Sequence, residues 1–131
     1  MVRTRHFRDL LVWQKAMQLA RDVYRVTSRF PKSEVFGITM QLRRAAVSVP
    51  SNIAEGHGRL SDKSLRVFLV QARGSFYEVE TQLQLAADLG YMEFGDVQAL
   101  NVECDEIAKM INGLLSAIER NAATGANPLT R

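Results

Sequence analysis

The sequence predicts an all-α fold, an antiparallel up-down-up-down bundle of four helices. Apolar residues recur every three or four positions through four segments between residues 10 and 120, and no stretch alternates with period two over a useful length. Links of about four to six residues join the last three segments, and short links favour antiparallel neighbours. The 131 residues form one domain, long enough for one core and too short for a cofactor domain plus a substrate domain.

The first two helices are expected over residues 10–28 and from just after Ser33 to residues 56–58. Phe30-Pro31 stops the first helix, because proline disfavours helical geometry in the residue before it. Ser33 is the expected N-cap of the second helix, since its hydroxyl can accept a backbone N–H. The Gly-His-Gly sequence at residues 56–58 ends that helix, because glycine can take the left-handed conformation of a helix terminus.

The third helix is expected over residues 61–90, and its length of about 28 residues, or ~42 Å, sets the long dimension of the molecule. Asp96 is the expected cap of the fourth helix, which carries the most regular apolar stripe of the chain. Residues 1–9 are then a basic arm, residues 10–120 the four-helix bundle, and residues 121–131 a disordered tail rich in small and polar residues.

Pro50 falls in the middle of the second helix, where it removes a backbone hydrogen bond and presses on the carbonyl of Ala46. This costs about 3 kcal/mol in an ordinary helix. Ser48, Ser51 and Asn52 flank the proline with side chains that can satisfy freed backbone groups, so we expect a continuous helix with a bend. Small residues beside a bend allow another backbone to approach, which suits subunit packing better than chemistry.

The second helix has two working faces. One is apolar and joins the core, while the other repeats polar and small side chains every three or four residues. Because only the apolar face is needed for the core, the polar face calls for a partner of its own. The residues expected to form a subunit interface or a hydrogen-bonded network are Gln41, Arg44, Ser48, Pro50, Ser51, Asn52 and Glu55.

The net charge of +3 hides a strong asymmetry along the chain. Residues 1–75 hold 14 Lys and Arg and 5 Asp and Glu, whereas residues 76–131 hold 3 and 9. Of the 17 basic residues, 13 are arginine, whose planar guanidinium suits bidentate contact with phosphate. The asymmetry has two interpretations that the sequence leaves open: an anionic partner, or two halves that neutralise each other across the folded bundle.

The expected topology gathers the basic arm, the end of the second helix and the start of the third at one end of the bundle, together with Lys15. We predict that this end is a basic pole. The candidate nucleic-acid-binding residues are Arg3, Arg5, Arg8, Arg59, Lys63, Arg66 and Arg73. A further basic row on the first helix, Arg21, Arg25 and Arg29, is more simply interpreted as an ordinary exposed face.

Other kinds of site find little support. His6 and His57 are the only histidines and lack a second ligand at helical spacing, so we expect no metal, no cofactor and no catalytic residue. Cys104 falls on the apolar stripe of the fourth helix and is expected to be a buried small hydrophobe. Because the sites above find little support, we expect a non-enzymatic protein. The lack of a membrane-length apolar run and of a signal-peptide pattern predicts a cytoplasmic protein that contacts no membrane, and the single cysteine agrees with a reducing compartment.

Several segments resemble one family. They are residues 41–56 (QLRRAAVSVPSNIAEG) with Gly58-Arg59, residues 7–16 (FRDLLVWQKA), residues 30–32 (FPK) and residues 74–78 (GSFYE). Together they are similar to the four-helix-bundle proteins encoded in intervening sequences of bacterial large-subunit ribosomal RNA genes. The resemblance implies a small bundle that assembles as a ring of five. It also implies kinship with the accessory variability proteins of diversity-generating retroelements, basic pentamers that work with a reverse transcriptase and bind nucleic acid.

Two functional hypotheses follow. The first is a ring-forming protein associated with nucleic acid, most simply RNA, in which five basic poles act together through avidity. The second is a protein-interaction scaffold without direct nucleic-acid contact, in which the arginines balance acids. The expected partners are further copies of the chain, RNA or DNA, and a nucleic-acid-processing protein. We rank the first ahead because the arginine bias and the charge asymmetry need no further assumption.

Overall fold

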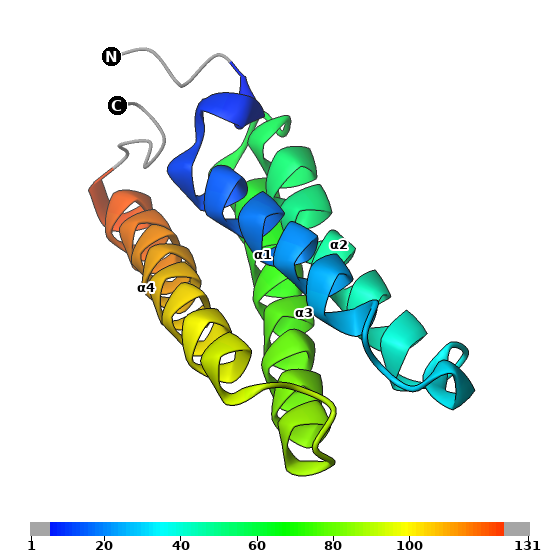
Figure 1. The fold of residues 1–131 in the computed structure, drawn as a ribbon. Coiled ribbons are helices and arrows are strands. Elements are labelled where there is room, and N and C mark those ends of the chain that lie inside the picture. The colour runs from blue at the N-terminus through cyan, green and yellow to red at the C-terminus, as the bar shows by residue number, and fades with distance from the viewer. Residues whose placement is uncertain (1–5, 125–131) are drawn as a thin grey trace.

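The structure, a computed structural model, describes residues 6–124. Within this range the chain forms α1 (Leu11–Thr27), α2 (Ile38–His57), α3 (Asp62–Asp88) and α4 (Phe94–Thr124), with the 3-10 helices η1 (Phe7–Asp9) and η2 (Lys32–Glu34) before α1 and α2. Residues 6–124 contain no strand. The predicted all-α fold of four helices is therefore confirmed (Figure 1).

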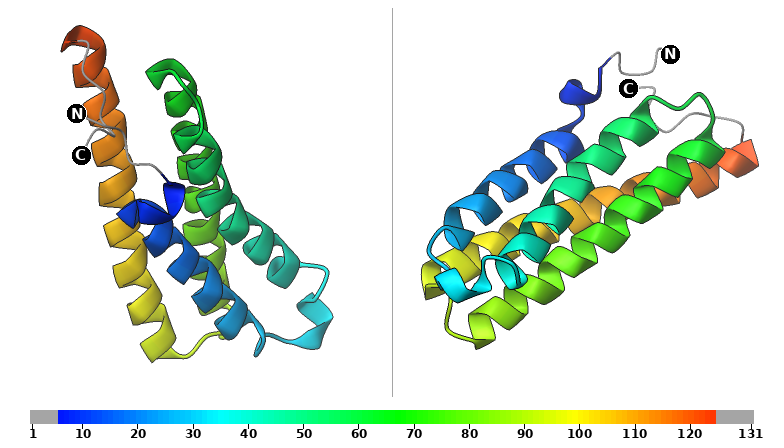
Figure 2. Two further views of the ribbon diagram at one scale, coloured as in Figure 1. Left: turned by 90° about the horizontal axis from the view of Figure 1, so that it is seen from above. Right: turned by 90° about the vertical axis from the view of Figure 1, so that its right-hand side faces the viewer.

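Each helix packs against two others. α1 lies against α2 and α4, α3 also lies against α2 and α4, and the α2–α3 contact is the most extensive. Within residues 6–124 the diagonal pairs do not approach closely. The beginning of α1, the end of α2, the beginning of α3 and the end of α4 lie at one end of the molecule (Figure 1), and Figure 2 shows α2 and α3 side by side along their length.

The core runs through all four helices at the positions that periodicity predicts. Its largest fully buried side chain is Phe76 of α3. The other large side chains that are almost completely buried are Leu19, Val23, Leu42, Val49, Ile53, Leu65, Leu69, Val79, Leu100, Ile107 and Ile111. At the end away from the α2–α3 link, the Phe30 ring packs 5.5 Å from the Tyr91 ring, so the α1–α2 connection closes over the α3–α4 connection.

α2 begins later than predicted, at Ile38 rather than just after Ser33. Ser33 lies in η2, and the N-cap position of α2 is Gly37, which makes no side-chain cap. A tertiary contact explains the difference, because the Tyr91 hydroxyl donates a 2.8 Å hydrogen bond to Glu34 and holds this segment against the α3–α4 connection. Residues 32–34 therefore form η2, and α2 has no turn at Ser33.

The other helix ends also correct the prediction. Gly58 caps α2 in a right-handed conformation (φ −74°), whereas Gly90, after α3, takes the left-handed one (φ 77°). α4 starts at Phe94, so Asp96 lies in its first turn, where its carboxylate accepts hydrogen bonds from Arg25 and Arg29 instead of capping the helix.

α4 is also longer than predicted. It has 31 residues against 27 in α3 and continues to Thr124, past the start of the predicted tail at residue 121. α4, not α3, is therefore the longest element. Residues 1–5 of the predicted arm and residues 125–131 of the predicted tail lie outside the described residues.

α2 continues through Pro50, as predicted. The Ser51 hydroxyl donates to the Val47 carbonyl at 2.8 Å, and the Asn52 amide donates to the Ser48 carbonyl at 2.9 Å. Pro50 has no N–H to donate to the Ala46 carbonyl, so the backbone hydrogen bond at that position is missing. The two side-chain bonds add to the hydrogen bonding of the next two carbonyls along the helix. Pro50 itself is buried, so its packing helps to hold the helix together.

The α1–α4 seam carries charges. Lys15 pairs with Glu106 at 2.9 Å, and Arg25 pairs with Asp96 at 3.2 Å. Glu103 of α4 lies beside Asp22 of α1 and has a buried carboxyl oxygen without a hydrogen-bond partner among residues 6–124. Burial first, and then the Asp22 carboxylate, raise the pKa of Glu103 to about 7.

The α2–α3 contact requires a glycine. A Cβ added at Gly56 would lie 2.9 Å from the Phe68 Cβ and 3.2 Å from a Leu65 methyl group. We predict that Gly56→Ala lowers the free energy of unfolding by about 1–3 kcal/mol, because it overpacks this contact. The matched control Gly74→Ala, in α3 with nothing within 4 Å, should instead raise it by up to about 1 kcal/mol through helix propensity. Denaturant titration measures both, and a Gly56→Ala variant as stable as the control would contradict this packing.

The raised pKa of Glu103 predicts a pH dependence of stability. Its pKa is about 7 in the folded chain and near the ordinary glutamate value of 4.5 in the unfolded chain, so the stabilising contribution is complete below pH 4.5 and is lost as pH rises through 7. Glu103→Gln should therefore flatten the fall in unfolding free energy across this interval, whereas Glu119→Gln, at an exposed site on the same helix, should not. Urea titrations at several pH values test this, and parallel curves for Glu103→Gln and the parent chain would refute it.

Candidate nucleic-acid interface and the polar network between α2 and α3

The structure brings four of the predicted basic residues to one end of the bundle. Arg8 lies in η1, Arg59 in the α2–α3 link, and Lys63 and Arg66 in the first turns of α3 (Figure 1). α3 begins here because the Ser61 hydroxyl caps it by accepting the Ser64 N–H at 3.2 Å. All four basic side chains are exposed.

Two of the four are held against aromatic rings. The Arg59 guanidinium lies 4.6 Å from the centre of the Phe68 ring and 3.8 Å from the Glu55 carboxylate. The Arg8 guanidinium lies 5.1 Å from the Phe7 ring centre. A guanidinium that rests on a ring face keeps its N–H donors at the edge of the plane, available to an anion.

Lys63 and Arg66 are different, because they make no hydrogen bond or ion pair within the described part of the chain. Both stand near the N-terminus of α3, where the helix dipole adds a partial positive charge. This end of the bundle therefore presents two cations, Lys63 and Arg66, that pair with no acidic side chain of residues 6–124. We call the cluster of Arg8, Arg59, Lys63 and Arg66 the basic end.

Other basic residues predicted for this end are engaged elsewhere. Arg73 lies seven residues beyond Arg66, about 10 Å along α3, and donates to the Asn112 side chain of α4 at 3.1 Å. Lys15 pairs with Glu106 across the α1–α4 seam. Arg3 and Arg5 lie outside the described residues.

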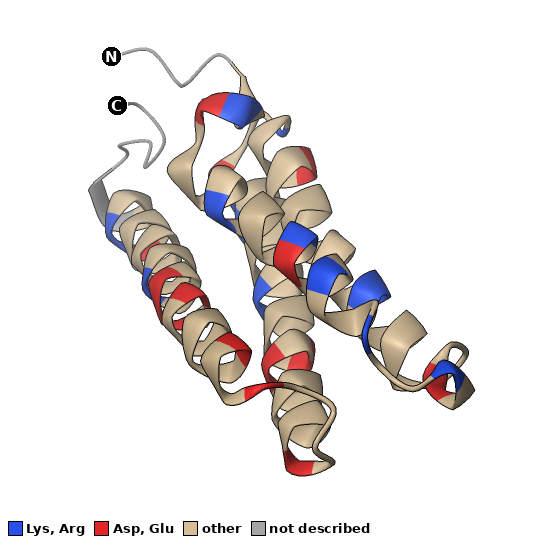
Figure 3. Cartoon of the chain, in the orientation of Figure 1, with Lys and Arg blue, Asp and Glu red and all other residues tan. Residues whose placement is uncertain are grey.

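The basic row of α1 is a structural feature. Arg25 contacts Asp22 and Asp96, and Arg29 contacts Asp96 at 3.1 Å and Glu93 at 4.0 Å. Figure 3 shows acidic residues along α4 and the second half of α3, and mostly basic residues along α1. Part of the charge asymmetry is thus neutralised across the fold, whereas Lys63 and Arg66 of the basic end pair with no acidic side chain within residues 6–124.

The polar face of α2 turns toward α3. The hydroxyls of Ser48 and Ser75 share a 2.8 Å hydrogen bond, and the Asn52 amide donates to the Ser48 hydroxyl at 3.0 Å. All three residues are half-buried between the helices. Sequence reasoning missed Ser75, whose signal is its position next to Phe76 on the edge of the apolar stripe of α3.

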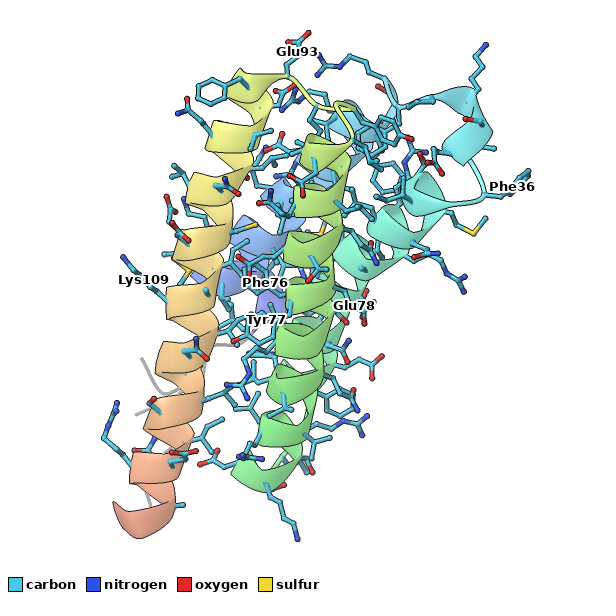
Figure 4. The ribbon with its side chains drawn as sticks, turned by 90° about the horizontal axis from the view of Figure 1, so that it is seen from below. Phe36, Phe76, Tyr77, Glu78, Glu93 and Lys109 are labelled. Carbon is cyan, nitrogen blue, oxygen red and sulfur yellow. The ribbon has the colours of Figure 1, made fainter. Side chains whose placement is uncertain are left out.

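A polar recess of about 390 Å³ continues this network along α2 and α3. Gln41 and Arg44 line it from α2, while Ser75, Glu78 and Gln82 line it from α3. Glu78 is labelled in Figure 4. The Gln82 side-chain oxygen is buried and has no hydrogen-bond partner among residues 6–124.

The predicted interface residues are therefore divided among three surroundings. Gln41, Arg44, Ser48 and Asn52 lie on the α3 side, where Arg44 also reaches a recess beside Tyr24. Pro50 and Ser51 line a groove toward α1, and Glu55 faces Arg59. They do not form one continuous face, because α2 packs against two helices at once.

Cys104 is buried, as predicted for a small hydrophobe. Burial, and then the Glu80 carboxylate, raise the pKa of its thiol to about 12. Among residues 6–124, no group of three or more His, Cys, Asp or Glu side chains could hold a metal ion, and none of the helices is long and apolar enough to span a bilayer.

The basic end and the polar network both lie in a part of the chain that matches a known protein family. Residues 8–113 match the family model described as 23S rRNA-intervening sequence protein. The chain belongs to this family. The match includes the polar face of α2, Arg59, Lys63 and Arg66, so the basic end and the polar network both lie within the part of the chain that defines a 23S rRNA-intervening sequence protein.

A solved structure supports the same fold. It is the crystal structure of a protein of unknown function from the S23 ribosomal protein family of Bacteroides thetaiotaomicron, 21% identical to this chain with a TM-score of 0.72. The similarity covers 80% of this chain and 98% of that one. No curated protein matches the chain.

The Ser48–Ser75 bond can be tested by a double-mutant cycle. Because it joins two helices of one chain, we predict that Ser48→Ala and Ser75→Ala are coupled by about 0.5–1.5 kcal/mol in the free energy of unfolding, at every protein concentration. Ser48→Ala with Ser116→Ala, an exposed serine of α4, is the control pair and should be additive. Additivity of the first pair, or coupling that appears only at high protein concentration, would place the bond between subunits instead.

Proposed function

We propose that this 23S rRNA-intervening sequence protein is a non-enzymatic protein that binds RNA through its basic end, in the cytoplasm. The observation that carries the proposal is that Lys63 and Arg66 stand exposed and unpaired, within the described residues, beside Arg8 and Arg59. The family description, which refers to intervening sequences of ribosomal RNA, favours RNA over other anions.

The chemistry of the basic end fits a phosphate backbone better than individual bases. Lysine and arginine that neutralise phosphates release counterions, which gives affinity that depends on salt and little on sequence. The rings of Phe7 and Phe68 lie beneath the guanidiniums of Arg8 and Arg59, so they are covered and do not offer open platforms for base stacking. We therefore propose recognition of RNA shape and charge.

One basic end alone would bind weakly, so the proposal includes assembly. A ring of five copies, which the family resemblance implies, would place five basic ends together and raise the affinity through effective concentration. We also propose that the chain is related to the accessory variability proteins of diversity-generating retroelements. A nucleic-acid-processing protein would then be a further partner. The alternative is a scaffold that binds proteins only.

A salt-dependent binding assay tests the proposal. We expect the protein to bind a fluorescent RNA hairpin at low salt, with log Kd rising linearly with log salt concentration. The double variant Lys63→Glu/Arg66→Glu should raise Kd about tenfold or more and reduce the salt slope by about two. Lys32→Glu/Lys109→Glu, which makes the same change in charge away from the basic end, is the matched control and should bind nearly as the parent chain does.

Each outcome decides between the two functions. No binding of hairpin or single-stranded RNA at low salt would refute RNA binding and leave the scaffold. An equal loss in both double variants would show that only net charge matters and that the basic end is not the site. Light scattering on the same samples gives the number of copies, with five expected.

A further inference from the structure

α1 and α2 leave an apolar groove open along their length. It has a volume of about 560 Å³ and is lined by Phe7, Trp13 and Met17 on one side and by Val47, Pro50 and Ala54 on the other, with Tyr24 at its far end. Val47 and Tyr24 remain 43% and 46% exposed, which is high for apolar side chains between two packed helices. Residues 6–124 therefore leave this surface uncovered.

The groove continues past Tyr24 into a second recess of about 290 Å³. Its apolar lining comes from Val35, Phe36 and Met40, at the start of α2 and just before it. Phe36 projects from this end of the molecule with 83% of its surface exposed (Figure 4). Tyr24 belongs to both recesses, so they form one apolar strip that follows α1. The 17 residues of α1 span about 25 Å, which is the length of four to five helical turns.

The charges along this strip all have one sign. Arg21 lines the groove, and Arg43 and Arg44 line the second recess, while neither recess is lined by an Asp or a Glu. Two of these arginines are held in place: Arg21 donates to Gln18 at 2.9 Å, and Arg43 donates to Thr27 at 2.8 Å and lies 4.7 Å from the Tyr24 ring centre. Within residues 6–124 none of the three pairs with a carboxylate.

We propose that this strip is the docking site for an amphipathic helix of another protein, whose apolar face fills the groove and whose acidic residues meet Arg21, Arg43 and Arg44. An apolar groove of this length accepts a helix through residues spaced at i, i+3 or i+4, and i+7. The fixed arginines select an acidic helix over a basic one, because like charges along a desolvated edge are strongly disfavoured. The site is separate from the RNA contact proposed for Lys63 and Arg66.

The probe is a designed helical peptide of about 18 residues with leucine and phenylalanine on one face and glutamate along both of its edges. Trp13 is the only tryptophan in the chain and lines the groove, so its emission reports binding directly. We expect the acidic peptide to shift this emission with a Kd in the micromolar range. A scrambled peptide of equal composition and a peptide with lysine in place of glutamate should leave it unchanged.

Two matched pairs of variants locate the site. Val47→Asp should weaken binding of the acidic peptide at least tenfold, whereas Val102→Asp, at a 59% exposed valine of α4, should not. Arg21→Glu should weaken the acidic peptide and admit the lysine peptide, whereas Arg66→Glu should do neither. Circular dichroism checks the fold of each variant, and Val47→Asp should keep its affinity for RNA.

Three kinds of result would refute the proposal: a loss of specificity, a change in assembly, or binding of a lipid instead. Equal binding of the scrambled peptide, or unchanged binding by Val47→Asp, would show that the groove does not read an amphipathic helix. A smaller assembly for Val47→Asp in light scattering would show that a second copy of the chain covers the groove. A shift of Trp13 emission by oleate but not by the acidic peptide would assign the groove to a lipid. Loss of RNA binding in Lys63→Glu/Arg66→Glu is independent of all three.

Discussion

The close approach of α2 and α3 is the constraint on which the other features depend. Gly56 lets the Phe68 side of α3 come within contact distance, and Ser48 and Ser75 are small enough to bond directly between the helices. This approach uses the polar face of α2 inside a single chain. On the side of α2 that faces α1, Pro50 and Val47 line the apolar groove.

The basic residues divide into two groups according to where their counter-charges lie. Lys15, Arg25 and Arg29 on α1 pair with acidic side chains of α4, so their charges are neutralised within the fold. Lys63 and Arg66 stand in the first turns of α3, which begins at Asp62, yet neither pairs with an acidic side chain within the described residues. The neutralisation interpretation is therefore correct for these residues of α1, whereas an anionic partner is our proposal for Lys63 and Arg66.

The sequence predicts the helices well, because apolar periodicity is a local property and most of the core follows it from Leu19 to Ile111. It fails where a distant residue decides. Ser33 has the chemistry of an N-cap, yet Tyr91 holds the neighbouring Glu34 and moves the start of α2. Arg73 has the spacing of a pole residue, yet Asn112 turns it toward α4. Ser75 could not be paired with Ser48, since periodicity does not tell which helix a polar face meets.

The α1–α4 contact and the α2–α3 contact are held by different kinds of interaction. Exposed ion pairs between α1 and α4 are screened by dissolved ions, whereas the glycine and serine contact between α2 and α3 depends on shape and a half-buried hydrogen bond. Concentrated salt therefore weakens the ion pairs of the α1–α4 seam, by at most about 1 kcal/mol each, and leaves the α2–α3 contact nearly unchanged. α4 stays in place under the same conditions, because Leu100, Ile107 and Ile111 anchor it in the apolar core.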